Sequence, residues 1–156
     1  MIVIRKTTTD DIENIYHHLN YNYVKKYYEN EAEEKKNYEK WYKFLVNSPL
    51  FVMFTVEDLG GLFLGSVKFE LEEDFEGAEI SIYLAKNIRG RGYSTTIVNA
   101  SIEELRFETP QLKYIVAYIL EENIQSIKCF EKAGFKLKGQ IERNEVEYLL
   151  YMKALD

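Results

Sequence analysis

The sequence passes from a predicted strand to a predicted helix through Arg89-Gly90-Arg91-Gly92-Tyr93-Ser94. Residues 78–84 alternate in polarity as a strand does, and residues 94–107 carry apolar side chains at helical spacing. A loop with two glycines before a helix start presents several free backbone N–H groups, to which the helix end adds partial positive charge. Lys86, Arg89 and Arg91 place three cations beside it. The segment therefore predicts a site for a phosphate or pyrophosphate.

The loop matches neither of the two common phosphate signatures. No Gly-Lys-Ser/Thr follows it, and the third glycine of a dinucleotide fingerprint would fall at Thr95. Glycine-containing turns between a strand and a helix also occur for packing reasons alone. The phosphate prediction therefore depends on the rest of the chain.

Length and composition narrow the class of protein. The chain has 156 residues, which predicts one domain over 1–156, and its 46% hydrophobic and 15% aromatic content predicts a globular fold. The net charge of -6 disfavours nucleic acid as a partner. One cysteine excludes an intramolecular disulfide, and the adjacent His17 and His18 point in different directions on a helix, so no metal site is expected. The absence of a leader pattern and of a long apolar run predicts a cytoplasmic protein without a membrane partner.

The order of elements predicts a mixed α/β fold. Polarity patterns and turn residues predict the order β-α-α-β-β-β-α-β-α-β-β, with Thr9 or Asp10 capping the first helix. Helices are expected at 11–19, 30–46, 94–107 and 123–133. Strands are expected at 2–6, 51–56, 62–70, 78–84, 114–120, 135–141 and 145–151. The strands within 51–84 should form an antiparallel meander, and the last two a hairpin that turns at Arg143-Asn144.

A second motif lies about 30 residues after the loop, in Asn123-x-x-Ser126-x-x-x-Phe130-Glu131-Lys132-x-Gly134-Phe135. The loop, this segment and the order of elements together resemble the GNAT superfamily of acetyl-CoA-dependent N-acetyltransferases. The loop is similar to the family's Arg/Gln-x-x-Gly-x-Gly/Ala signature, with Ser94 at the final small position. The resemblance covers nearly the whole chain and implies a mixed, mostly antiparallel sheet flanked by helices on both faces. The branch it resembles contains the ribosomal-protein serine, spermidine and nucleotide-linked amino-sugar acetyltransferases.

The resemblance also implies how acetyl-CoA, the acyl donor, would bind. The loop would bind the pyrophosphate, while the backbone of Ile82 to Leu84 would pair with the pantetheine arm. That strand typically splays from the next, here 114–120, and leaves a V-shaped slot for the thioester. The implied cofactor-binding residues are Ile82, Leu84, Arg89, Gly90, Arg91, Gly92, Tyr93, Ser94, Asn123, Ser126 and Phe130.

Glu79 is the first candidate for proton acceptor. A thioester is already activated, so the enzyme must mainly align the reactants, remove a proton from the ammonium and stabilise the developing charges. Strand alternation places Glu79, Ser81 and Tyr83 on one face, and some GNAT enzymes carry a general-base glutamate in a similar context. The alternative is a solvated charge, because six of the ten residues 70–79 are acidic.

Phe130 departs from the family pattern. Many members carry a tyrosine there that donates a proton to the departing thiolate, which phenylalanine cannot do. Tyr83, Tyr118 or water could take that part, although with 13 tyrosines any single one is more often a packing residue. Tyr118 also stands where the ribosomal-protein alanine acetyltransferases carry their base, which argues against that subgroup. Cys129 is interpreted as a structural helix residue and not as a nucleophile.

The acceptor is the least determined part of the prediction. The leading hypothesis is a primary amine of a small molecule, such as a nucleotide-linked amino sugar or a polyamine, attacking acetyl-CoA directly in a ternary complex. A protein N-terminus or lysine, a module that binds acetyl-CoA without transfer, and another donor such as succinyl-CoA stay open. Aromatic residues of the first two helices could contact the acceptor or form core and homodimer contacts: Tyr16, Tyr21, Tyr23, Tyr27, Tyr28, Tyr38, Trp41, Tyr42 and Phe51.

Overall fold

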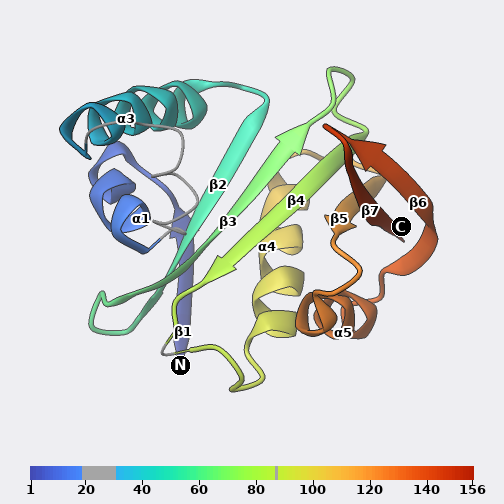
Figure 1. Ribbon diagram of the computed structural model, residues 1–156. Coiled ribbons are helices and arrows are strands. Elements are labelled where there is room, and N and C mark those ends of the chain that lie inside the picture. The colour runs from blue at the N-terminus through green and yellow to red at the C-terminus, as the bar shows by residue number, and fades with distance from the viewer. Residues whose placement is uncertain (19–30, 87) are drawn as a thin grey trace.

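The computed structural model describes residues 1–18, 31–86 and 88–156, and its strands form one sheet in the order β1-β2-β3-β4-β5-β7-β6 (Figure 1). The strands are β1 (Ile2–Lys6), β2 (Phe51–Asp58), β3 (Phe63–Leu71), β4 (Gly77–Leu84), β5 (Tyr114–Ile119), β6 (Lys136–Arg143) and β7 (Val146–Ala154). Every neighbouring pair is antiparallel except β4 and β5, which are parallel. The mixed, mostly antiparallel sheet and the order of its elements confirm the predicted fold class.

Helices cover both faces of the sheet. A short 3₁₀ helix, η1 (Thr9–Asp11), leads into α1 (Ile12–His18), which packs with α3 (Glu31–Asn47) on one face. On the other face lie α4 (Ser94–Glu108), which Figure 1 shows behind β3 and β4, and α5 (Ile124–Lys132). Because each helix buries one apolar stripe, the two faces hold two separate clusters of buried side chains.

The larger cluster lies between the sheet and α4. The predicted apolar stripe of α4 is fully buried there, against strand residues that include Val67, Phe69 and Ile115. Burying an aliphatic or aromatic side chain of this size stabilises the fold by about 1.5–3 kcal/mol. The stripe consists of Ile97, Val98, Ile102 and Leu105.

The smaller cluster joins α1 and α3 to the sheet. Tyr38, Tyr42 and Leu45 of α3 are buried in it, as their spacing predicts, and Tyr16 of α1 lies edge-on to Tyr38. Trp41, expected on the same stripe, is instead 47% exposed and contacts Tyr38, Tyr42 and Lys68. The predicted aromatic contacts of Tyr21, Tyr23, Tyr27 and Tyr28 lie outside the described residues.

The first helical segment is capped one residue earlier than predicted. Thr8, not Thr9 or Asp10, is the N-cap residue. The backbone N–H of Thr8 donates to the Asp11 carboxylate at 2.8 Å. The same carboxylate accepts two bonds from Arg5, at 2.7 and 2.9 Å, and Arg5 also binds Glu57 of β2 at 2.9 Å. A tertiary ion pair therefore selects the cap among three adjacent candidates.

The last hairpin turns one residue later than predicted. Asn144 and Glu145 occupy the turn with φ of 52° and 65°, the left-handed pair that a two-residue hairpin loop requires. Arg143 is consequently the last residue of β6 and not a turn residue. This shift places its side chain on the sheet.

Within the described residues, no helix is long and apolar enough to cross a membrane, and no group of three or more His, Cys, Asp or Glu side chains could hold a metal ion.

Candidate active site

The β4 and β5 strands separate after a short paired stretch. Their ladder runs only from Gly77↔Tyr114 to Glu79↔Val116, although β4 continues to Leu84. At the two ends of β4, the Gly77 carbonyl accepts from the Glu72 N–H and the Ala85 N–H donates to the Leu64 carbonyl, so the odd-numbered residues form hydrogen bonds with β3. The backbone groups of Ile82 and Leu84 therefore point toward the gap between β4 and β5. Such a strand edge can pair with an extended ligand, as the predicted slot for pantetheine requires.

The glycine loop follows directly on this edge. Gly90 and Gly92 have φ of 75° and 81°, in the left-handed region that favours glycine. A Cβ at either position would meet no atom within 4 Å. Backbone conformation, and not crowding, is therefore the reason for glycine at both positions.

The start of α4 offers unpaired backbone donors. Tyr93 is the N-cap residue but makes no side-chain cap, and the first turn holds no acidic residue. The first bond into the helix runs from Ile97 N–H to the Tyr93 carbonyl, so the N–H groups of residues 94–96 lack an acceptor within the helix. With the helix dipole, the two glycines and the exposed Lys86 and Arg91, this arrangement suits a pyrophosphate.

Arg89 braces the loop against the strand. Its Nε donates to the Leu84 carbonyl at 2.7 Å, and its guanidinium lies 5.4 Å from the centre of the Tyr83 ring. The side chain was predicted to bind the pyrophosphate. In the structure it ties the loop to the end of β4 and contacts Tyr83 there, and its contact with the pyrophosphate stays a prediction.

The second predicted motif lies at the start of α5, beside α4. Asn123 caps α5 through its Oδ1, which accepts from the Ser126 N–H at 3.3 Å. Phe130 is only 3% exposed and packs edge-on against Phe135 with ring centres 5.0 Å apart. Cys129 is buried as well. The structure therefore gives Asn123 and Phe130 structural contacts, and their predicted contacts with the cofactor stay predictions.

Glu79 and Tyr118 flank the separation of the strands on the opposite face from α4. Glu79 is the last residue of β4 that pairs with β5, and its partner there is Val116. Tyr118 lies two residues after Val116 on β5. Arg143 joins them, because its Nη1 donates to Glu79 Oε1 at 3.1 Å and its guanidinium lies 4.2 Å from the centre of the Tyr118 ring. Tyr148 stands edge-on to Tyr118. The structure thus brings together two of the three predicted catalytic residues, and Tyr83 lies apart at the end of β4.

Sequence reasoning missed Arg143. The residue is 64 positions from Glu79 in the sequence and looks like part of a turn. Its one local signal is that it is the single cation among residues 142–147, where Glu142, Glu145 and Glu147 surround it.

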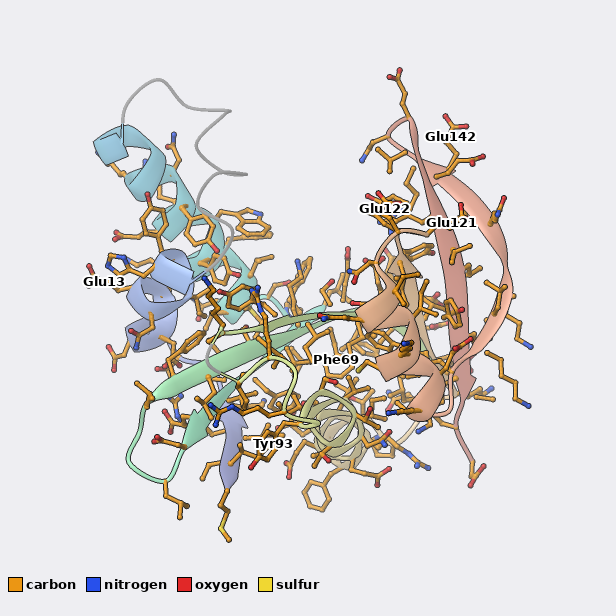
Figure 2. The ribbon with its side chains drawn as sticks, turned by 60° about the horizontal axis from the view of Figure 1, so that its bottom comes forward. Glu13, Phe69, Tyr93, Glu121, Glu122 and Glu142 are labelled. Carbon is orange, nitrogen blue, oxygen red and sulfur yellow. The ribbon has the colours of Figure 1, made fainter. Side chains whose placement is uncertain are left out.

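The surroundings of Glu79 are acidic. Glu70 stands directly opposite Glu79 on β3, a like-charge pair that costs stability. At the same end of the sheet, the hydrogen bond of Tyr114 to Glu72, together with burial and nearby carboxylates, raises the pKa of Tyr114 to about 12. Figure 2 shows further acidic side chains gathered on one side of the molecule, well apart from Tyr93 at the start of α4: Glu121, Glu122 and Glu142. Lys86 and Arg91 therefore lie beside the loop, whereas Glu70 and Glu72 lie near Glu79 at the start of β4.

Comparisons with known proteins agree with this geometry. The model of the acetyltransferase (GNAT) domain family matches residues 2–136. The chain is 24% identical to the spermidine N(1)-acetyltransferase of Vibrio cholerae over 123 residues, which are 78% of this chain and 70% of that protein. It is 32% identical to a kanamycin resistance protein of Rhizobium radiobacter over 72 residues, 46% of this chain and 65% of that protein.

Solved structures show the same fold. A mutant of the Vibrio cholerae spermidine N-acetyltransferase SpeG aligns with a TM-score of 0.82 at 19% identity, over 98% of this chain and 93% of that one. The aminoglycoside acetyltransferase AAC(6')-Ib in complex with coenzyme A and kanamycin aligns with a TM-score of 0.80 at 20% identity, over 99% of this chain and 95% of that one. The family model extends over most of the chain and includes the glycine loop and the parted strands. The chain therefore belongs to the GNAT acetyltransferase family and is an acyltransferase.

Proposed function

We propose that this protein moves the acetyl group of acetyl-CoA to a primary amine of a small molecule, by direct attack in a ternary complex. The observation that carries the proposal is the separation of β4 and β5 between two oppositely charged ends. The uncapped start of α4 lies at one end, and the Glu79 carboxylate lies beside the separation on the other face.

The cofactor would lie along the edge of β4. Its pyrophosphate would accept from the N–H groups of residues 92–96, with Lys86 and Arg91 beside it. Its pantetheine amides would pair with the backbone of Ile82 and with the N–H of Leu84, whose carbonyl already accepts from Arg89. In this arrangement the thioester would lie near the point where the strands part. The bound coenzyme A in the AAC(6')-Ib structure supports acetyl-CoA as the donor.

Transfer needs two proton movements. Glu79, through its Oε2 or through water, would take the first proton from the ammonium, so that the amine nitrogen can attack the thioester carbon. As the C–S bond breaks, the second proton passes from the nitrogen to the thiolate. Tyr118, which shares with Glu79 the contact with Arg143, would supply a proton to the thiolate and take one from the nitrogen, whereas Phe130 has no proton to give.

The charge near Glu79 favours a cationic acceptor. Glu70 and Glu72, which lie beside Glu79 at the start of β4, would attract a polyamine or another molecule with several ammonium groups. The same carboxylates would repel the diphosphate of a nucleotide-linked amino sugar. The spermidine and kanamycin in the names of the two related proteins point in the same direction.

The test is a panel of amines with acetyl-CoA, in which release of free coenzyme A thiol reports transfer. Polyamines and aminoglycosides should give the highest kcat/KM, nucleotide-linked amino sugars less, and peptides with a free N-terminus or lysine the least. Thiol release that is highest with peptides would favour a protein acetyltransferase. If calorimetry shows binding of acetyl-CoA but no amine gives thiol release, the protein is a module that binds acetyl-CoA without transfer. The phenylalanine at position 130, which cannot donate a proton, is the reason to test this alternative.

A further inference from the structure

Arg143 contacts side chains of β4 and of β5 at the point where the two strands separate. It ends β6, the outermost strand of the sheet, and reaches across β7 and β5 to Glu79 on β4. The hairpin curls over the sheet, and Figure 1 shows the end of β6 directed toward the beginning of β4. One guanidinium therefore contacts both sides of the gap, the carboxylate of Glu79 and the ring of Tyr118.

We propose that Arg143 is a positioning residue for acetyl transfer, one that holds Glu79 and Tyr118 in a fixed relation across the separation of β4 and β5. The inference rests on the proposed function, in which Glu79 accepts the proton of the amine. Arg143 itself touches neither the donor nor the acceptor in this scheme.

The backbone alone does not set the spacing of the two side chains. The ladder between β4 and β5 ends at Glu79↔Val116, and Tyr118 lies beyond it. A planar guanidinium can donate in its own plane to a carboxylate while its face covers an aromatic ring, which a lysine ammonium cannot do. The hydrogen bond to Oε1 restrains the rotation of the Glu79 carboxylate, so that Oε2 keeps one orientation.

The ion pair of Arg143 spans the sheet and is not local to the hairpin. Arg143 pairs in register with Val146, so Glu142 and Glu147, which pair with each other, lie on the opposite face, and the ion pair of Arg143 is with a residue 64 positions away. The side chains of Arg143 and Glu79 are 42% and 27% exposed, and pairs this exposed add little to folding stability. The contact with the ring and the position beside the parted strands indicate a part in orientation.

The test compares Arg143→Gln and Arg143→Lys with Arg106→Gln, in which a similarly partly exposed arginine loses an ion pair of 3.2 Å to Glu103 on α4. The amine that is most active with the wild-type protein is the acceptor. The readouts are kcat and KM for that amine across pH, the Kd of coenzyme A, and the thermal midpoint of unfolding.

We expect Arg143→Gln to lower kcat at least tenfold near neutral pH, with less effect at alkaline pH, where the amine no longer needs a base. The Kd of coenzyme A should stay within twofold, Arg143→Lys should recover only part of the activity, and Arg106→Gln should behave as wild type. Adding Arg143→Gln to Glu79→Gln should cost no further activity, because both changes remove one function.

Three results would overturn the inference: equal activity of the Arg143→Gln and Arg106→Gln variants, additive losses in the double variant, or a gain in amine affinity on removing the arginine. The last result would mean that Arg143 occupies the place of the acceptor cation. Absence of thiol release by the wild-type protein on every amine is a different outcome, because it refutes the proposed function from which this inference starts.

Discussion

Gly92 provides the sharpest test of the loop, through Gly92→Val with Gly61→Val as its matched control. The two glycines have nearly the same backbone, with φ of 81° and 88°, and a Cβ at either meets no atom within 4 Å. Figure 1 shows the β2–β3 turn, which holds Gly61, and the loop before α4 as separate parts of the lower edge. The two changes therefore impose the same strain at different places.

The strain and the loss of affinity can both be given a size. A residue with a side chain in the left-handed region costs about 1–2 kcal/mol, so both variants should lose about that much free energy of unfolding. In Gly92→Val, relief of the strain rotates the neighbouring N–H groups out of the cradle. One hydrogen bond to a charged group is worth about 1.5–3 kcal/mol, so the loss of one donor should weaken coenzyme A binding about 10- to 150-fold.

Calorimetry with coenzyme A measures the affinity, and urea unfolding measures the stability of each variant. We expect Gly61→Val to lower stability alone and Gly92→Val to lower both quantities. If Gly92→Val binds coenzyme A as tightly as wild type while losing the same stability as the control, residues 89–94 do not form the pyrophosphate cradle.

Three further predictions concern Glu79, Asn123 and Asp11. Glu79→Gln should lower turnover mainly near neutral pH and less at alkaline pH, where the amine is already deprotonated, and an equal loss at every pH would remove Glu79 as the proton acceptor. Asn123→Ala removes the helix cap and should lower the free energy of unfolding by about 1 kcal/mol, whereas Asn123→Ser keeps the cap. A fall in coenzyme A affinity in both variants would show that the amide contacts the cofactor. Burial alone would raise the pKa of Asp11, but the hydrogen bonds from Arg5 and the Thr8 N–H outweigh it and lower the pKa below its ordinary 3.8. The stability from Asp11 is therefore complete at neutral pH and lost as pH falls below 3.8. Asp11→Asn should lower the free energy of unfolding by about 1.5–3 kcal/mol at pH 7 and by less at pH 3. Urea midpoints of the variant and wild type that differ equally at both pH values would contradict this.

Local patterns predicted most of the secondary structure. The helix expected at 94–107 is observed as α4 over Ser94–Glu108, and the strand expected at 114–120 as β5 over Tyr114–Ile119. Periodicities of 3.6 and 2 residues, together with turn residues, are properties of the chain over one element, so they can be read without the fold. The errors occur at the ends of elements, where side-chain contacts select between neighbouring residues, as the bonds of Asp11 to Arg5 and to the Thr8 N–H do for the cap at Thr8.

Some parts of the candidate site could likewise be predicted from the sequence and others could not. The sequence by itself determined the glycine loop, the helix that follows it and the family resemblance, because those signals lie in short consecutive segments. Only the tertiary structure decided that Phe130 is buried, that Arg89 binds the end of β4, and that Arg143 meets Glu79 and Tyr118. The contact of Arg143 depends on the twist and curl of the sheet, which accumulate over several strands and leave no mark in any single segment of the sequence.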